Sequence, residues 1–420
     1  MALGKLRAIV AGLIAVNTMG AWAAAPSQVP PDVGERARPE YDPVGVPLGA
    51  FVFYPKVNMA TEYNDNIYAA ETGAASDLIF RIAPSLRLTT AWPTDKMTLR
   101  AFGGINRYLD HASEDTDTYG VNGDAEFSIH NATALRGSID FRHAVLARES
   151  ILSSPATEHP VEYNQGSAHL EATQGFGNFQ LMGFADWLRL AYQDSVAPDG
   201  STVFEKDLNY ETISGGLRGG YAVSPDSSVF VSGRMFTTEF LAKPPLVPLD
   251  RSSHGYEVTG GFNLHVTDVL SGDIGAGYLH ARYPHITGSQ QDVGTLAVHV
   301  ALAWYPTLLT TVKFRVGRSI EEAPMQISSG FLVTRYQAEI DHELRRNVVL
   351  NAGVEYSDGS FRGTDRRDSQ WKVGAGATYL LNPMMSVKLS YAYQSRESEG
   401  LARGPGFNSN TISLAFVLQR

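Results

Sequence analysis

The chain contains no cysteine, which excludes several kinds of exported protein. A disulfide framework and a lipid-anchoring cysteine are both ruled out. After the N-terminus no segment offers about 18 unbroken apolar residues, so we expect no helix that spans an inner membrane. Charged residues make up only 19% of the chain, and the net charge of -10 argues against nucleic acid as a partner.

Enzyme motifs are missing as well. The 11 histidines are scattered, and there is no HExxH motif and no acidic calcium loop. Glycine pairs such as Gly374-Gly376 lie inside alternating stretches rather than before a helix, so phosphate binding is not indicated. The catalytic pairs that can be drawn, Asp110-His111 and His285 with Ser289, are weak. We therefore expect no enzyme, no cofactor and no metal.

The first 50 residues carry an export signal and a proline-rich leader. Lys5 and Arg7 precede a short apolar run and small-residue cleavage sites, which predicts a cleaved signal peptide over residues 1–25. Residues 26–50 contain six prolines and few aromatics. They predict an extended periplasmic linker, either disordered or docked on a periplasmic partner. No composition shift divides residues 51–420, which we take as one domain.

Strict alternation of apolar and polar residues dominates this domain. Between Ile412 and Leu418, and between Val387 and Gln394, every second residue is apolar. Side chains alternate across a β-strand, so each strand has one apolar and one polar face. A soluble sandwich would pack the apolar face on a second sheet, whereas an outer-membrane barrel turns it to lipid.

The connections between strands decide between the two. Short turns such as Ser224-Pro225-Asp226 and Asn382-Pro383 alternate without a break with longer polar connections such as 149–162 and 242–253. Tight periplasmic turns and longer external loops are typical of outer-membrane barrels. The pattern predicts a single all-β, antiparallel, up-and-down transmembrane barrel.

We count about eighteen strands, with sixteen as the alternative. The predicted starts lie near Val52, Leu78, Met97, Tyr119, Ala134, Gly166, Phe179, Asn209, Val229, Gly255, Leu270, Val293, Leu308, Leu332, Val348, Gln370, Met385 and Asn408. An even count places both termini in the periplasm. A barrel of this size encloses an aqueous channel unless an inward-folded loop fills it.

Alternation also selects the side chains that line the lumen. The charged residues that it turns inward are Arg81, Arg87, Arg136, Arg142, Lys313, Arg315, Glu339, Asp341, Glu343, Glu355, Lys372 and Lys388. The acids should lie beside Lys313, Arg315 and Lys372. They form either an ion-pair lattice that stiffens the wall or a transverse field that orients a solute. On the outer face we expect aromatic belts that include Trp304, Tyr305, Tyr356, Trp371 and Tyr379.

One motif makes the chain look familiar. The segment from Glu62 to Tyr68 reads EYNDNIY, at the end of the first predicted strand. Together with the segments 158–163, 341–347, 366–368, 379–382 and 391–398, it resembles the putative β-barrel porin 2 family over roughly residues 50–420. Some members are similar to barrels encoded with exopolysaccharide machinery, so the resemblance implies a polymer-export role. It implies no catalytic residues.

We therefore expect a conduit in the outer membrane of a Gram-negative bacterium. Our preferred reading is export of an exopolysaccharide or similar polar polymer, with periplasmic polysaccharide-export proteins as partners. The alternatives are a general diffusion porin for small solutes and a structural or adhesive barrel with a closed lumen. The other expected partners are outer-membrane lipid and the barrel assembly machinery. The chain departs from the usual pattern by ending Leu418-Gln419-Arg420 instead of on an aromatic residue.

Overall fold

The computed structural model of the chain describes residues 31–130, 132–151, 153, 157–243, 249–266, 269–286, 292–322 and 330–420. The predicted signal peptide, residues 1–25, lies outside the described residues. Within them no helix is long and apolar enough to cross a membrane, and helical conformation is confined to short 3-10 turns such as η1 (Ala112–Glu114) and η2 (Lys206–Leu208).

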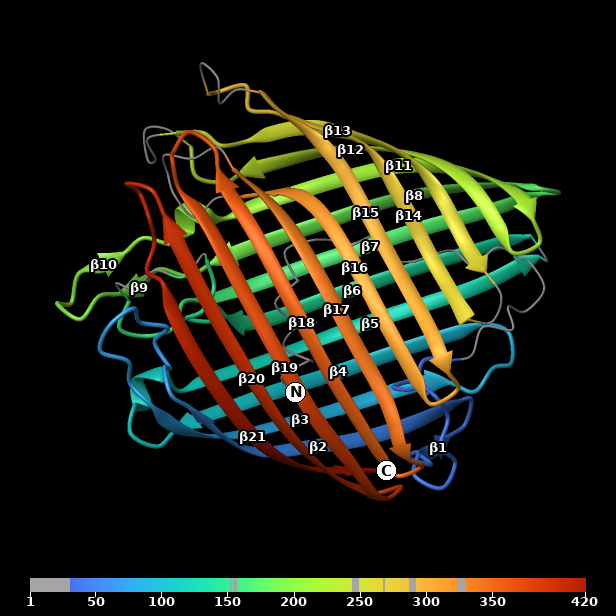
Figure 1. Ribbon diagram of the computed structural model, residues 1–420, viewed down its shortest axis with the longest axis horizontal. Coiled ribbons are helices and arrows are strands. Elements are labelled where there is room, and N and C mark those ends of the chain that lie inside the picture. Colours follow the sequence, from blue (N-terminus) through green and yellow to red (C-terminus); the bar gives the residue numbers. More distant parts are fainter. Residues whose placement is uncertain are drawn as a thin grey trace.

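Eighteen antiparallel strands close into one barrel (Figure 1), which confirms the predicted fold class. Each strand pairs with the next along the chain, and the last strand closes the ring by pairing with the first. The barrel strands are β2 Phe51–Asn64, β3 Asp77–Thr90, β4 Lys96–Tyr108, β5 Thr116–His130, β6 Thr133–Val145, β7 Glu162–Phe176, β8 Phe179–Tyr192, β11 Tyr210–Ser224, β12 Ser227–Phe240, β13 Ser253–Val266, β14 Leu270–Arg282, β15 Asp292–Thr307, β16 Thr310–Glu321, β17 Phe331–Arg345, β18 Val348–Phe361, β19 Arg367–Asn382, β20 Met385–Glu399 and β21 Phe407–Gln419.

Three short strands are additional to the eighteen that close the barrel. β1 (Val46–Leu48) pairs with the start of β2, and β9 (Ser195–Val196) forms a hairpin with β10 (Thr202–Val203) in the connection between β8 and β11. The eighteen predicted starts agree with the observed ones to within four residues; the largest difference is Gly166 against Glu162.

Alternation settles the two faces of each strand. On β20, Leu389 and Tyr391 are exposed on the outer surface, whereas Ser386 and Ser390 are buried on the inner face. Tyr356 and Trp371 also lie outside, with ring centroids 4.6 Å apart. These rings suit an aromatic belt at the membrane interface.

The prediction that Tyr305 faces outward was wrong. It follows Trp304, which is exposed on the outer face, so the pleat turns Tyr305 into the lumen. There its hydroxyl donates a hydrogen bond of 2.8 Å to Asp32 of the leader. A buried phenol with a carboxylate partner is more stable in this position than one facing lipid.

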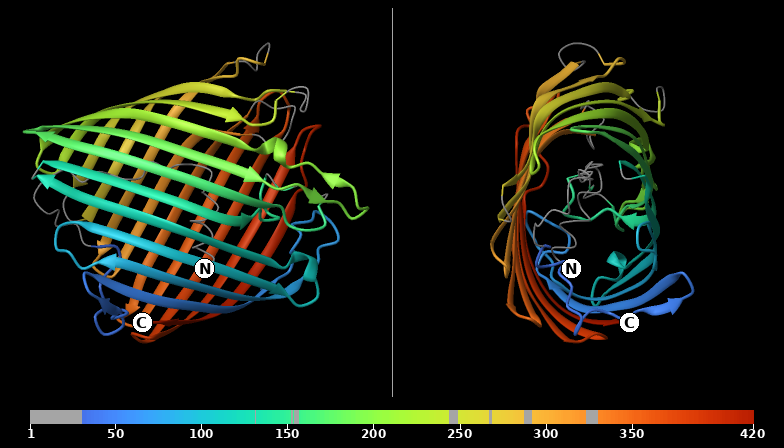
Figure 2. Two further views of the ribbon diagram at one scale, coloured as in Figure 1. Left: turned by 180° about the vertical axis from the view of Figure 1, so that it is seen from behind. Right: turned by 90° about the vertical axis from the view of Figure 1, so that its right-hand side faces the viewer.

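Long and short connections sort to opposite ends of the barrel, whose cross-section is oval (Figure 2). β1 and the end of β21 both lie at the short-turn end (Figure 1). Strand tilt is pronounced, as closure of a sheet into a barrel requires.

The EYNDNIY motif fastens the closure of the barrel. Asn64 accepts a hydrogen bond from Ser409 of the last strand at 3.0 Å, and Asp65 accepts two from the backbone and side chain of Asn410 at 2.6 and 2.7 Å. Asn66 donates to the carbonyl of Asn408 at 2.9 Å. Three consecutive polar side chains thus hold β21, the last strand, against β2, the first strand of the barrel. The motif therefore has a structural role.

The sorting of connections makes a topological prediction. Leu401 in the long β20–β21 connection and Leu308 in the short β15–β16 turn are both strongly exposed. In the natural cysteine-free background, Leu401→Cys should react with an impermeant maleimide on intact cells, and Leu308→Cys should react only after lysis. Loops 149–162 and 242–253 should behave like Leu401, and the turns at 224–226 and 382–383 like Leu308. Labelling of Leu308→Cys on intact cells would show that the short turns, and not the long connections, face the outside of the cell.

Candidate solute pathway through the barrel

The lumen holds a cavity of about 700 Å³. Each barrel strand from β6 to β20 contributes residues to its lining, which includes both charged and apolar side chains. Among the polar ones are Gln165, Arg234, Glu257, His299, Arg335 and Lys372. A volume of this size matches a small-molecule site, which typically measures about 300–1,000 Å³. Two parts of the chain enter the lumen beside this cavity, the β6–β7 connection and the leader.

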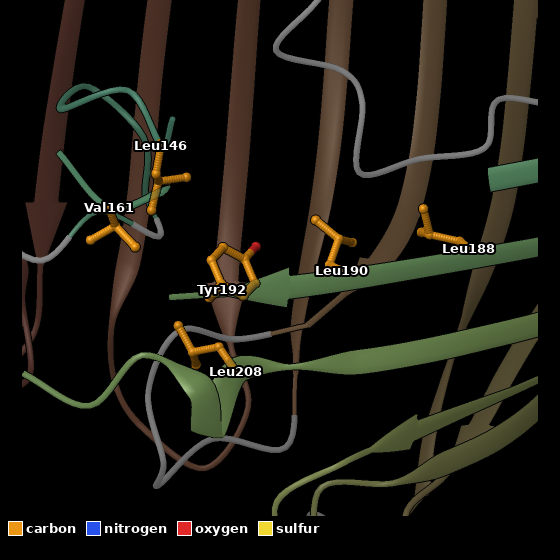
Figure 3. Close-up of a cluster of buried hydrophobic side chains, with 6 residues drawn as sticks. All are labelled: Leu146, Val161, Leu188, Leu190, Tyr192 and Leu208. Carbon is orange, nitrogen blue, oxygen red and sulfur yellow. The ribbon is translucent and has the colours of Figure 1, made fainter. Parts of the chain in front are cut away.

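One part of the chain that enters the lumen is the connection between β6 and β7, residues 146–161. Its two ends are held together by a hydrogen bond of 2.7 Å from the Leu146 amide to the Val161 carbonyl. Both side chains pack on the inner face of β8, in a buried apolar cluster completed by Leu188, Leu190, Tyr192 and Leu208 (Figure 3). Burial of a side chain of this size contributes about 1.5–3 kcal/mol. The base of the connection is therefore fixed against the inside of the wall.

A second fastening braces the same base. The Arg148 guanidinium donates to both carboxylate oxygens of Glu114, at 2.6 and 3.0 Å, and to Thr157 at 2.8 Å. Glu114 is 1% exposed, so this is a buried, bidentate ion pair. Breaking such a pair by removing one partner leaves an uncompensated charge, which makes the conformation of residues 146–161 costly to change.

The far part of the connection reaches the opposite wall. Ile151 packs against the buried cluster of Phe331, Val333 and Phe361 on β17 and β18. The Ser150 carbonyl accepts a hydrogen bond of 3.2 Å from Arg396 on β20. In the ring order of the barrel, β6 is the fifth strand from β2 and β17 the fourteenth, so the two are nine positions apart among eighteen. The described residues of the connection therefore reach across the lumen from one wall to the opposite one.

The leader narrows the short-turn mouth. Its Asp32 carboxylate accepts the hydrogen bond from Tyr305 and pairs with the Lys313 ammonium of β16. Arg38 pairs with Glu343 at 2.9 Å, and the Val33 amide donates to the Thr311 hydroxyl at 3.0 Å. Val33 is fully buried. The described part of the leader, residues 31–50, therefore differs from the extended linker that the prolines predict, because its charges find partners on the inner wall.

All twelve charged residues predicted to line the lumen lie on inward faces. Most of them are ion-paired, as the lattice interpretation requires. The pairs are Arg81 with Glu62 (2.6 Å), Arg136 with Glu126 (2.9 Å) and Glu171 (3.4 Å), Arg142 with Asp140 (2.6 Å), Arg315 with Glu339 (3.5 Å), Lys372 with Glu355 (3.2 Å), and the leader pairs of Lys313 and Glu343. The remaining acid, Asp341, lies against Gly34 of the leader.

Arg87 and Lys388 are the two exceptions. Neither forms an ion pair within the part of the chain that the structure describes. Two further inward cations that the sequence analysis missed, Lys56 and Arg100, are unpaired in the same sense. The signal was present, because Lys56 alternates in phase with inward Glu62 on β2 and Arg100 in phase with Phe102 on β4.

Two acids in the long connections, Glu205 and Glu322, have raised pKa values and are therefore only partly ionised near neutral pH. Burial raises the pKa of Glu205 to about 7, and the neighbouring charges of Asp207 and Asp194 add to the effect. Burial likewise raises the pKa of Glu322 to about 8, against the opposing influence of Arg251. At neutral pH Glu322 is therefore mostly protonated, so it adds little negative charge at the end of the lumen where the long connections lie.

The weak catalytic pairs do not assemble as drawn. His111 contacts Asp77 at 2.9 Å rather than Asp110, and Asp77 also accepts four backbone hydrogen bonds from residues 109–111. Such a carboxylate organises a loop. His285 lies 3.6 Å from Asp250, and Ser289 is outside the described residues. No cluster of three potential ligands for a metal occurs among the side chains that the structure describes.

The chain is similar to known outer-membrane barrels. Solved structures that match it include the outer membrane protein OpdK from Pseudomonas aeruginosa (10% identity, TM-score 0.45, 88% of this chain and 99% of that chain). Others are OccK2 (OpdF) from Pseudomonas aeruginosa in complex with glucuronate (10%, 0.45, 89% and 99%) and the siderophore receptor PiuA from Acinetobacter baumannii (9%, 0.46, 88% and 82%). No curated protein matches the chain.

The family match covers nearly all of the sequence. The family described as putative β-barrel porin 2 matches residues 38–420, from the Arg38 that holds the leader in place to the last residue. This agrees with the resemblance carried by the EYNDNIY segment. The chain belongs to the putative β-barrel porin 2 family and is a porin-like β-barrel of the outer membrane.

Proposed function

We propose that the chain is a passive diffusion channel for small polar solutes. The observation that carries the proposal is the β6–β7 connection, whose described residues contact two opposite walls beside a cavity of about 700 Å³ lined by charged, polar and apolar side chains. A water-filled lumen with fixed charges passes hydrated solutes without moving parts. The family match supports the same reading.

Polymer export, which the sequence analysis preferred, has less support. A polymer chain would have to thread past the crossing connection at one level and the docked leader at another. Both are held by buried ion pairs, Arg148 with Glu114 and Arg38 with Glu343, so neither yields without loss of stability. The predicted periplasmic export partners therefore stay a prediction, and we favour the porin alternative.

Solute size distinguishes the three functions. Purified protein in proteoliposomes should allow a monosaccharide to enter, seen as swelling in an isotonic solution, and should exclude a long oligosaccharide. A general conduit for polymers would admit both. A structural barrel with a closed lumen would admit neither, and that result would overturn the proposal.

A further inference from the structure

Four inward cations gather on one sector of the lumen wall, and we define them as the basic cluster: Lys56 on β2, Arg87 on β3, Arg100 on β4 and Lys388 on β20. Arg87 and Arg100 are direct cross-strand partners, and Arg87 is likewise opposite Tyr54 on β2. Directly opposed side chains have Cβ atoms about 5 Å apart. Lys56 is two residues from Tyr54 on the same face, and the charges of Arg100, Lys388 and Arg87 all act on it.

Like charges placed opposite one another destabilise a sheet, so a cluster without acids needs an explanation. Elsewhere most inward cations pair with acids, as in Arg81–Glu62 and Lys372–Glu355. Arg218 on β11 instead donates to Asn263 and lies over the Phe230 ring, but it stands alone and not in a cluster of cations. Within the described chain no member of the basic cluster has an ion-pair partner. The nearest acid along the strands is Asp124 on β5. It lies opposite Thr98, which is the inward residue next to Arg100 on β4, and it forms no ion pair with the cluster.

The two guanidinium groups are held in place by rings instead of carboxylates. Arg87 lies over Tyr54 at 4.3 Å from the ring centroid, and Arg100 lies near Phe102 at 5.4 Å. Stacking on a ring fixes the plane of a guanidinium while leaving its N–H donors free. A planar, preoriented fork suits bidentate recognition of a carboxylate or a phosphate.

We infer that the basic cluster is a binding step for small anions on their way through the channel, with carboxylate- or phosphate-bearing solutes as the preferred class. The inference rests on the proposed function and narrows its substrates. An exposed site inside a water-filled lumen binds weakly, which permits release on either side. The cluster places four positive charges on one sector of the lumen wall, so it gives the channel a preference for anions over cations.

Reversal potentials in a salt gradient test the preference. The wild type should select chloride over potassium, most strongly at about 0.01 M salt, where the screening length is about 30 Å. The fourfold variant Lys56→Gln, Arg87→Gln, Arg100→Gln and Lys388→Gln should lose this preference. A matched control, Lys372→Gln with Glu355→Gln, removes an ion pair without changing net charge and should keep it. Current with unchanged selectivity in the fourfold variant would overturn the inference but leave the channel function intact.

Binding provides a second readout that needs no current. Calorimetry of the detergent-solubilised protein with citrate and, separately, with inorganic phosphate should show uptake by the wild type and the control pair, and none by the fourfold variant. Whichever anion binds identifies the source chemistry. Equal uptake by the fourfold variant, or none by the wild type, would overturn the site. Absence of current together with intact binding would instead count against the channel function alone.

Discussion

Removing the part of the β6–β7 connection that reaches across the lumen should raise conductance by roughly twofold or more, because the narrowest cross-section limits the current through a barrel of this size. The change is replacement of residues 149–157 by a short Gly-Ser linker, which leaves Leu146 and Val161 on the wall. The variant loses the contact of Ile151 with β17 and β18, the bond from Arg396 to Ser150 and the bond from Arg148 to Thr157, but it keeps the Arg148–Glu114 pair. Planar-bilayer recording measures the result.

The matched control shortens a connection of similar kind elsewhere. The β9–β10 hairpin projects from the long-loop end (Figure 1), and removal of its turn, residues 197–201, should leave conductance unchanged. An equal rise in both variants would mean that loop length in general, and not the crossing of the lumen, limits the current. No rise after shortening 149–157 would place the narrowest point elsewhere, with the docked leader as the next candidate.

An arginine on the outer face of β20 should cost much more than one on its inner face. Leu389→Arg places a charge among the lipid-facing side chains, where arginine near the bilayer midplane costs about 2–4 kcal/mol. Ser390→Arg instead turns the side chain into the lumen. Its cross-strand partners are the small residues Gly376 and Ser413, and the inner face does not meet lipid.

The folded fraction of each variant after refolding into lipid, read over a urea series, measures the difference. Leu389→Arg should shift the unfolding midpoint to lower urea, and Ser390→Arg should shift it little. Similar losses in both variants would contradict the assignment of faces on β20.

The barrel wall was predictable because its signals are local. Each strand alternates on its own, and each turn carries its own glycine, proline or asparagine, so even the start at Phe179 was located without knowledge of any partner. Lumen charges such as Glu355 and Lys372 followed from phase alone. Tyr305 was misplaced because two adjacent aromatics cannot both face outward in a regular strand.

What could not be predicted depends on contacts between distant residues. The leader docks through Asp32 and Lys313, and proline content gives no hint of that pair. Ile151 finds its apolar partners at Phe331, on a strand opposite to its own. Lys56 and Arg100 could have been identified by phase, but their significance lies in the absence of partners, which only the assembled barrel reveals.

Single-channel recording of the unmodified protein shows whether its lumen conducts. We expect stable, stepwise currents in a planar bilayer, with conductance below that of the variant shortened at residues 149–157. A wild type that never conducts, while the shortened variant does, would contradict this expectation by showing that residues 146–161 close the barrel instead of narrowing it.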